Sequence, residues 1–501
     1  MTLRKALAAL VPALLASASC HGIAMAQETG ADSEESSKSS YYRDAEIQLE
    51  RQIADVAQTG KARNLIIFIG DGMGVSSITA GRIYKGQKHG QDGESYPLAM
   101  DSMPWSALVK TYSHDFQVAD SAATATAIVT GTKTRSGMLG VGPEVVRDDC
   151  AASLAGSVPT LFEMAEDKGL ATGVISTARI THATPASTYS HAPNRDWEND
   201  TMLPAGSACK DIARQLVEWP HGDGFEVVFG GGRANFLPKG SADPEYADKT
   251  GARGDGRDLT AEWMAAHPNG RFVWNSEGFQ AFDPMVGGPV LGLFERSHMQ
   301  FEADRAGDSG GEPSLADMVS VAIAKLSRDP DGFVLMVEGG RIDHAHHAGN
   351  AKRALEDLAA FDDAIARTLT MVNMDETLVL VTADHSHVFT IAGYPPRNNP
   401  ILGLGSIDED GHTAPARDGK SYTTLGYMNG PGAVPAGERP DPADQDTEAL
   451  DYLQQSLVPT HSETHGGEDV ALKAAGPQAQ LFHGTIEQNL IFHIARHILG
   501  W

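Results

Sequence analysis

Two carboxylates and three imidazoles directly follow a strand-like apolar run in this chain. Residues 332–337 read Gly-Phe-Val-Leu-Met-Val, and the chain continues as Glu338-Gly-Gly-Arg-Ile-Asp343-His-Ala-His-His347. In an open α/β sheet, ligands bind beyond the carboxyl ends of the strands. Asp343 and His347 are four residues apart, so they can share one face of a helical turn and hold one ion. The segment therefore predicts a metal site at a sheet edge rather than a plain solvated loop.

Apolar runs elsewhere predict the sheet to which this segment belongs. Short runs typical of buried strands alternate with stretches that have helical apolar spacing. The predicted strands cover residues 64–69, 171–176, 227–229, 333–337 and 377–382, and the predicted helices cover residues 42–58, 159–168, 211–218, 314–326 and 351–371. This alternation predicts an α/β fold with a doubly wound, mostly parallel central sheet and helices on both faces. Residues 394–460 are rich in Gly, Pro and Asp, and we interpret them as a surface insertion.

The N-terminus has the pattern of a signal peptide at residues 1–26. A basic start precedes an apolar stretch at residues 6–18 that is too short to span a membrane, and an Ala-x-Ala cleavage site ends the segment. Lipid attachment at Cys20 is the lower-ranked alternative, because a serine stands where such sites usually carry an apolar residue. Residues 27–41 are rich in Ser and Glu and predict a disordered spacer. The protein is expected to be exported, either to the periplasm or as a secreted protein.

Composition limits the partners that the protein can have. The 501 residues carry a net charge of −27, which argues against nucleic acids and anionic membranes as partners. No later segment is apolar enough to predict a transmembrane helix. Cys150 and Cys209 are the two cysteines outside the leader, and an even number in an exported protein favours a disulfide, with two buried free thiols as the alternative.

Asp71 lies in a glycine-rich segment that follows the predicted strand at residues 64–69. Residues 70–74 read Gly-Asp-Gly-Met-Gly, but Val75 stands where a dinucleotide fingerprint needs its third glycine. An aspartate flanked by glycines suits a metal ligand, although a glycine-rich turn is an equally good interpretation of this segment alone.

Further ligands follow the last predicted strand. Asp384 and His385 come directly after it, and His465 lies late in the chain. Together with Asp71 and Asp343, they would meet at one sheet edge. Mixed Asp and His ligation suits zinc, and additional carboxylates suit a harder ion such as magnesium.

Ser121 and Arg195 are the candidates for phosphate chemistry. Ser121 begins an alanine-rich helix, where a serine is most often a cap, although the same position favours a bound or developing anion. A serine is a nucleophile only if its pKa is lowered, and no histidine is close in sequence, so a metal would have to do this. Arg195 could bind two oxygens of one phosphate, although a lone arginine is usually a surface charge.

Six segments, taken together, resemble the alkaline phosphatase family. They are IIFIGDGMG, DSAATATA, THATPASTYSHAPNRDW, VEGGRIDHAHH, TADHSHVF and ETHGGEDV, in this order over about residues 60–500. His182 and His344 make the animal-type branch closer than the enterobacterial one. The resemblance implies a catalytic domain at residues 42–501, a crown-like insertion at 394–460, a homodimer, and hydrolysis of small-molecule phosphate monoesters.

The resemblance also implies roles for individual residues. Ser121 would become phosphorylated, and Arg195 would bind two phosphate oxygens. Zinc and magnesium ligands are implied as follows: Asp343, His347 and His465 for one zinc, Asp71, Asp384 and His385 for the second, and Asp71, Thr184 and Glu338 for one magnesium ion. Thr184 stands where animal enzymes carry serine, and His182 and His344 would lie just outside these ligands.

Two peripheral features are implied as well. A possible calcium site of the animal branch maps to Glu245, the Phe294 carbonyl, Glu295 and Glu312, the last of which is aspartate in animals. Cys150 and Cys209 match a disulfide of that branch.

Two alternatives remain open from the sequence. A phosphodiesterase or sulfatase of the same superfamily would share most of the ligands, but Ser121 in place of threonine or a formylglycine-type cysteine, together with Arg195, favours monoesters. A non-catalytic periplasmic protein that binds phosphate or metal would need no nucleophile at a helix start.

Overall fold

The strands predicted from apolar runs lie together in the middle of a ten-stranded sheet. In the computed structural model they are β1 (Asn64–Gly70), β3 (Ala171–Arg179), β4 (Val227–Gly231), β7 (Phe333–Gly339) and β8 (Thr377–Ala383). They lie in the order β8-β1-β7-β3-β4, and all four neighbouring pairs are parallel. β1, β7 and β8 are buried along their whole length, which explains why their sequences are apolar without alternation.

The structure describes residues 58–408, 410–412 and 414–501. The predicted signal peptide, the spacer and the helix expected at 42–58, apart from its last residue, lie outside these ranges. Within the described ranges, no helix is both long enough and apolar enough to cross a lipid bilayer.

The outer strands of the sheet were not predicted. They are β2 (Trp105–Lys110), β5 (Arg271–Val273), β6 (Val290–Leu293), β14 (Val470–Ala475) and β15 (Gly484–Glu487). β14 is antiparallel to both of its neighbours, β2 and β8, so the sheet is mixed on this side. β2, β5 and β15 are short and partly exposed, and their patterns are weaker than those of the central strands, whereas β6 is buried but has only four residues.

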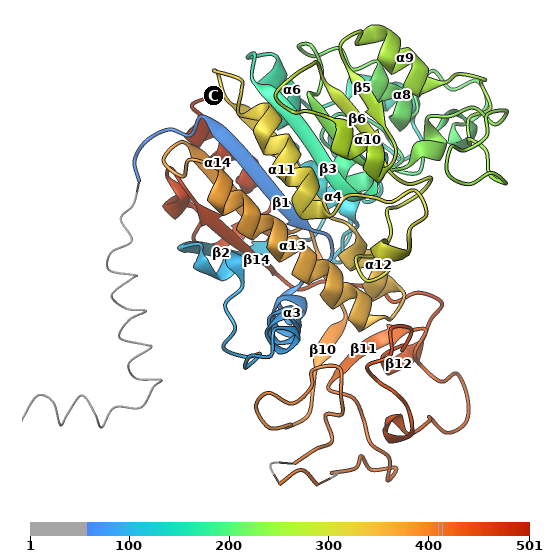
Figure 1. The fold of residues 1–501 in the computed structure, drawn as a ribbon, viewed down its shortest axis with the longest axis vertical. Helices are drawn as coiled ribbons and strands as arrows, with labels where there is room; N and C mark the ends of the chain where they lie inside the picture. The colour runs from blue at the N-terminus through green and yellow to red at the C-terminus, as the bar shows by residue number, and fades with distance from the viewer. Residues whose placement is uncertain (1–57, 409, 413) are drawn as a thin grey trace, which may run out of the picture. The chain divides into compact units, whose positions relative to one another are not determined.

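Helices flank the sheet, as the alternating pattern predicts. The predicted helices appear as α6 (Leu161–Glu166), α8 (Ile212–Val217), α11 (Leu315–Leu326) and α13 (Ala351–Met371). α11 and α13 lie side by side across the sheet in Figure 1. The other helices are α3 (Val75–Lys88), α4 (Ser121–Thr130), α5 (Cys150–Ala155), α7 (Ala183–Ala186), α9 (Leu259–Ala266), α10 (Ser276–Ala281), α12 (Arg341–His347) and α14 (Leu490–Leu499).

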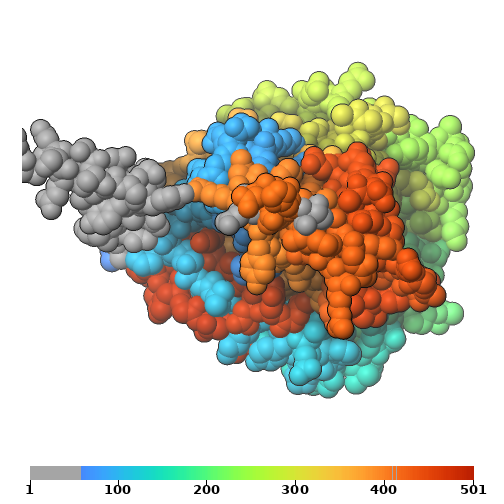
Figure 2. Space-filling model, turned by 90° about the horizontal axis from the view of Figure 1, so that it is seen from below, coloured from blue at the N-terminus to red at the C-terminus, as the bar shows by residue number. Residues whose placement is uncertain are grey.

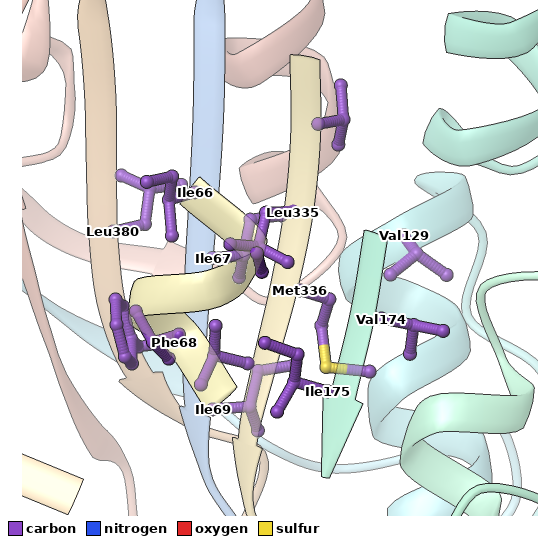
Figure 3. Close-up of a cluster of buried hydrophobic side chains, with 14 of the residues drawn as sticks. Ile66, Ile67, Phe68, Ile69, Val129, Val174, Ile175, Leu335, Met336 and Leu380 are labelled. Carbon is purple, nitrogen blue, oxygen red and sulfur yellow. The ribbon is translucent and has the colours of Figure 1, made fainter. Parts of the chain in front are cut away.

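The core lies between these helices and the central strands. Figure 3 shows Val129 of α4 beside Val174 of β3, and Met336 of β7 nearby. Phe68 of β1 meets Phe361 of α13 edge to face, with ring centroids 5.6 Å apart. This packing fixes the position of the central strands relative to α4 and α13. Both helices connect to segments that carry site residues.

The segment interpreted as an insertion contains most of a second small sheet. β10 (Phe389–Ile391) pairs with β11 (Leu425–Gly430), and β11 pairs with β12 (Ser456–Pro459). The segment lies at the lower end of the fold in Figure 1 and faces the viewer in Figure 2. Its strands were not predicted, because glycine, proline and aspartate dominate the surrounding sequence.

Cys150 and Cys209 form a disulfide, as predicted. Cys150 is the first residue of α5, and Cys209 lies shortly before α8. The bond therefore joins α5 to the segment before α8, and the residues between the two cysteines include Thr184 and Arg195.

Candidate active site

Three central strands end at the same level and bring the predicted ligands together. Gly70 at the end of β1 lies opposite Gly339 of β7 and Ala383 of β8. Asp71 follows β1 at once, and Asp384 follows β8. α12 follows β7 and carries Asp343 and His347. The three buried strands end opposite one another, and this common register therefore determines the positions of these side chains.

His465 reaches this edge through a separate short pairing. β13 (His465–Gly466) is antiparallel to β9 (Ser386–His387), and His465 lies opposite His387. The close approach also explains Gly72, whose φ is +66° and whose missing side chain leaves room for the His387 ring.

His347, His465 and Asp343 form a first cluster. The Nε2 atoms of the two imidazoles are 3.1 Å apart, and each is 3.4 Å from Asp343 Oδ1. Both Nδ1 atoms face carbonyls, since His347 Nδ1 is 2.6 Å from the Glu463 oxygen and His465 Nδ1 is 2.8 Å from the Ala119 oxygen.

The hydrogen bonds of this cluster determine where its protons lie. A carbonyl only accepts, so each Nδ1 donates, and each neutral ring then has a lone pair on Nε2. Two lone pairs and a carboxylate oxygen that face one another repel, unless a cation lies between them. Imidazoles oriented through Nδ1 in this way are typical of zinc ligands.

Asp71, Asp384 and His385 form a second cluster, beside Ser121. His385 Nε2 lies 3.3 Å from Asp71 Oδ1 and 3.4 Å from Asp384 Oδ2. Burial and the neighbouring Asp71 raise the pKa of Asp384 to about 6. Although burial opposes it, Asp384 and Asp71 raise the pKa of His385 to about 10. The cluster therefore attracts positive charge strongly.

A third group of oxygens lies on the far side of Asp71. Asp71 Oδ2, Thr184 Oγ1 and Glu338 Oε1 are buried and have no hydrogen-bond partner. The other oxygen of Glu338 accepts a hydrogen bond from Ser176 Oγ. Burial and the charge of Asp71 raise the pKa of Glu338 well above its ordinary value. Buried oxygens without partners are costly, and a hard cation would satisfy all three.

Ser121 is the first residue of α4 and faces the second cluster. Its Oγ lies 3.1 Å from His385 Nε2 and 3.4 Å from Asp71 Oδ1. The preceding residue, Asp120, caps the helix by accepting a hydrogen bond from the Ala123 amide. Ser121 is 2% exposed, so its hydroxyl is held in a largely desolvated position.

Arg195 is held against the same helix start. Its Nη1 donates to Asp120 Oδ2 at 2.9 Å, and its Nη2 donates to His182 Nε2 at 3.0 Å. Although burial opposes ionisation, Arg195 holds the pKa of Asp120 below its ordinary value. The guanidinium therefore stays charged and oriented beside Ser121.

The comparison with known proteins decides the family. A model described as alkaline phosphatase matches residues 62–501 of this chain. The chain belongs to the alkaline phosphatase family. The prediction from the six motifs is thereby confirmed, and the chain is an enzyme with phosphatase activity.

Relatives in animals are similar over most of their length. The tissue-nonspecific alkaline phosphatase isozyme of Gallus gallus is 45% identical over 442 residues, which cover 86% of this chain and 83% of that protein. The same isozyme of Homo sapiens is 44% identical over 446 residues, covering 87% and 83%. This agrees with the predicted closeness to the animal branch.

Solved structures confirm the predicted fold class. The alkaline phosphatase of Thermus thermophilus has a TM-score of 0.63 and 25% identity, and the match covers 89% of this chain and 92% of that one. The alkaline phosphatase of the Antarctic bacterium TAB5 has a TM-score of 0.60 and 24% identity, covering 88% and 99%. A variant of the TAB5 enzyme was solved with Mg bound in a site named M3.

Two residues that the sequence analysis missed hold the first cluster of this alkaline phosphatase. His387 Nε2 lies 2.8 Å from Asp343 Oδ1, and its Nδ1 lies 2.6 Å from Glu463 Oε2. Glu463 also accepts from the Val388 amide and is 1% exposed. The available signals were the second histidine of Asp384-His-Ser-His387 and an acidic residue two positions before His465. Asp120 was missed as well, although an aspartate before a helix is a common cap.

His344 lies outside both clusters. Its Nδ1 is 3.2 Å from Arg341 Nη1, and its ring is 5.3 Å from that of His182. His298, which the sequence analysis did not identify, lies 4.1 Å from His344 between ring centroids. The three imidazoles thus form a group beside Arg195.

The residues predicted for calcium form an acidic cluster around Gln300. Gln300 Nε2 donates to Glu295 Oε1 at 2.7 Å, and its amide donates to Glu312 Oε1 at 2.8 Å. Both oxygens of Asp308, which was not predicted, and Glu312 Oε2 are buried without partners. Burial and Asp308 raise the pKa of Glu312 to about 9. Arg233 pairs with Glu245 at 2.9 Å and partly neutralises the cluster.

Proposed function

We propose that this phosphatase hydrolyses phosphate monoesters to an alcohol and inorganic phosphate through a phosphoserine on Ser121. The observation that carries the proposal is the position of Ser121 Oγ, 3.1 Å from His385 at the start of α4. A helix start favours a negatively charged group through its free amides and its dipole. An oxygen nucleophile and a phosphate binding site therefore coincide.

We infer that the first and second clusters each hold a zinc ion and that the unpartnered oxygens of Asp71, Thr184 and Glu338 hold magnesium. The donor sets fit these ions, because imidazole and carboxylate suit zinc and oxygen-only ligation suits magnesium. When bound, the ions supply positive charge next to the serine oxygen, the phosphate oxygens and the leaving oxygen.

The remaining steps depend on the protein's own side chains. Arg195 presents two N–H groups on one plane and binds two oxygens of the substrate phosphate, as guanidinium groups do. Asp120 keeps that guanidinium in place from the opposite side. Asp71 and His385 contact the Ser121 oxygen and restrict its orientation. The largely buried position of Ser121 excludes competing water from the first displacement.

Several further assignments remain proposals. We propose that Glu245, the Phe294 carbonyl, Glu295 and Glu312 bind calcium, with Asp308 as an added ligand, because the unpartnered buried oxygens of Glu312 and Asp308 need a cation. We also propose that the protein is exported, that it is periplasmic or secreted, and that residues 394–460 act as a crown in a homodimer.

Covalent labelling tests the central proposal. Incubation with labelled inorganic phosphate at mildly acidic pH, followed by denaturation, should leave label on a peptide that contains Ser121. The Ser121→Ala variant should carry none. Thr124→Ser, one turn along the same helix, is the control that keeps Ser121, and it should label normally. Equal labelling of wild type and Ser121→Ala would contradict the proposal.

A further inference from the structure

A row of basic side chains lies beside Arg195 and is used by none of the metal clusters. It consists of Arg179, His298, His344 and Arg341, here called the basic row. Arg179 Nη1 lies 2.6 Å from His298 Nε2, the rings of His298 and His344 are 4.1 Å apart, and His344 Nδ1 lies 3.2 Å from Arg341 Nη1. All four residues are intermediate between buried and exposed.

His182 connects the basic row to the phosphate site. Its ring lies 5.3 Å from the rings of both His298 and His344, and its Nε2 accepts from Arg195 at 3.0 Å. The His182 ring would therefore lie between a group bound by the basic row and a phosphate bound by Arg195.

Arg341 has no carboxylate partner among the described residues. Its guanidinium stacks on Phe301 at 3.6 Å and contacts His344, and its buried Nε has no hydrogen-bond acceptor. Nearby arginines differ, since Arg179 pairs with Glu198 at 2.6 Å and Arg353 with Asp304 at 2.7 Å. An unpaired guanidinium is unusual in a protein with a net charge of −27.

The row also has more donors than acceptors. His298 Nδ1 lies 3.2 Å from the Arg179 amide and its Nε2 lies 2.6 Å from the Arg179 guanidinium, and a neutral ring can accept from only one of these two donors. His344 Nδ1 accepts from Arg341, which leaves its proton on Nε2. Burial, together with the neighbouring basic groups, lowers the pKa of His298, so this ring stays neutral. The row thus presents N–H groups that lack acceptors.

We propose that the basic row is a subsite for a second anionic group on the alcohol part of the substrate. The enzyme would then prefer phosphate monoesters whose leaving group carries a carboxylate or a second phosphate. The proposal rests on the proposed function, because it places the reacting phosphate on Arg195. The acceptor oxygens of such a group satisfy the free donors of the row, and Arg341 supplies the charge.

Two substrates that differ in one group test the subsite. 3-Phosphoglycerate carries a carboxylate where glycerol 3-phosphate carries a neutral alcohol. We expect wild type to have the lower KM for 3-phosphoglycerate. His298→Asp places a carboxylate in the row, and Arg341→Gln removes its unpaired charge. Each should raise the KM for 3-phosphoglycerate about tenfold, the loss expected for one charge-assisted hydrogen bond, and should change the KM for glycerol 3-phosphate less than about twofold.

Three controls make the comparison specific. Arg341→Lys keeps the charge and should retain most of the preference. His298→Asn keeps a neutral donor and should lose less than His298→Asp. His483→Asp makes the same charge change at an exposed histidine outside the row and should leave both KM values unchanged.

A binding measurement covers the case in which a variant folds poorly. Isothermal titration of the metal-loaded wild type should show tighter binding of 3-phosphonopropionate than of propylphosphonate, since only the former carries a carboxylate. Equal affinity, or an equal change in KM for both substrates in the variants, would overturn the subsite while leaving the proposed function intact. Failure of wild type to hydrolyse either substrate would instead contradict the proposed function.

Discussion

His347 and His465 show how single hydrogen bonds determine the chemistry of a site. Each ring donates through Nδ1 to a backbone carbonyl, so each presents an unprotonated Nε2 to Asp343. The carbonyls belong to Glu463 and Ala119, which lie far from α12 in sequence. The backbone therefore selects the tautomer that binds a metal, before any metal is present.

Glu463 should tune the affinity of the first cluster for the proposed zinc ion without being a ligand. It accepts from His387, which in turn contacts Asp343, so Glu463→Gln should weaken the orientation of both. We expect the free zinc concentration at half-maximal activity to rise roughly tenfold or more. Zinc titration of the chelated enzyme in metal buffers measures this.

Glu468→Gln is the matched control for that experiment. Glu468 belongs to the same segment but bonds to Ser386 at 2.7 Å rather than to an imidazole. Its zinc titration should match that of wild type, and an unchanged titration for Glu463→Gln would remove Glu463 from this role.

At the residue scale, the sequence identified the proposed ligands but not the residues that orient them. Asp343, His347 and His385 stand next to apolar strands, and the resemblance assigned their roles. No comparable sequence signal identifies His387, His298 and Asp120. Their roles depend on which side chains the fold brings within 3 Å. The assignment of ions to the ligands stays a prediction.

At the scale of elements, α6 and β3 share a buried acidic contact. Glu166 at the end of α6 accepts from Thr172 Oγ1 of β3 at 2.6 Å. Burial, together with Glu226 and Asp223, raises the pKa of Glu166 to about 8 from an ordinary value of 4.5. The folded protein therefore holds a proton that the unfolded chain releases at lower pH.

The free energy of unfolding should consequently fall as pH rises from about 5 to about 9. Between the two pKa values the folded state binds one more proton than the unfolded state, so raising the pH favours unfolding. Glu166→Gln keeps an acceptor for Thr172 and removes this pH-dependent contribution to the free energy of unfolding. The contribution is on the order of a few kcal/mol at most. Its urea unfolding curves should depend less on pH than those of wild type.

An exposed glutamate provides the control for the pH experiment. Glu277→Gln removes a charge at an exposed position in α10 and should keep the pH dependence of wild type. An identical pH slope for Glu166→Gln and wild type would show that Glu166 is ionised in the folded protein.

The disulfide links α5 to the segment before α8. It closes a loop over a sequence separation of 59, for which chain entropy predicts about 4 kcal/mol of stabilisation. Cys150→Ser should lower the melting temperature and make magnesium-dependent activation easier to lose, because the loop carries Thr184. Calorimetry and magnesium titration of wild type and variant measure both effects.

Thiol titration of the denatured, unreduced protein is the companion measurement. Protein purified from an oxidising compartment should show no free thiol at Cys150 or Cys209. Two reactive thiols would contradict the bond.

Central and peripheral elements differ in how well the sequence predicts them. β1, β7 and β8 are buried on both faces, which forces continuous apolar sequence that is easy to find. β2 alternates buried and exposed residues, and β5 has three residues, so neither differs clearly from a loop pattern. α3 follows the glycine-rich segment and was missed, because its amphipathic pattern is weak.

At the scale of the whole molecule, the insertion exposes an apolar edge. Leu457 and Val458 of β12 are 72% and 43% exposed, and Met428 of β11 is 51% exposed. Exposed apolar side chains on one small sheet are typical of a subunit contact. This edge agrees with the proposed homodimer.

Leu457→Lys should therefore weaken the dimer. Placing a charge in an apolar contact desolvates an ammonium group without a partner. Light scattering after size-exclusion chromatography should give twice the chain mass for wild type and a concentration-dependent decrease for the variant. Leu154→Lys, at another exposed leucine that is 62% exposed, is the control and should remain dimeric. A monomeric wild type would contradict the homodimer.

The strand order has a consequence for protein synthesis. His465 lies just before β14, and β14 enters the sheet between β2 and β8, so the proposed ligand His465 is translated after all the other proposed ligands. A nascent chain of about 460 residues contains Asp71, Ser121 and Asp384 but not His465. Such a chain lacks one side chain of the first cluster, so we expect phosphatase activity only after His465 has been translated.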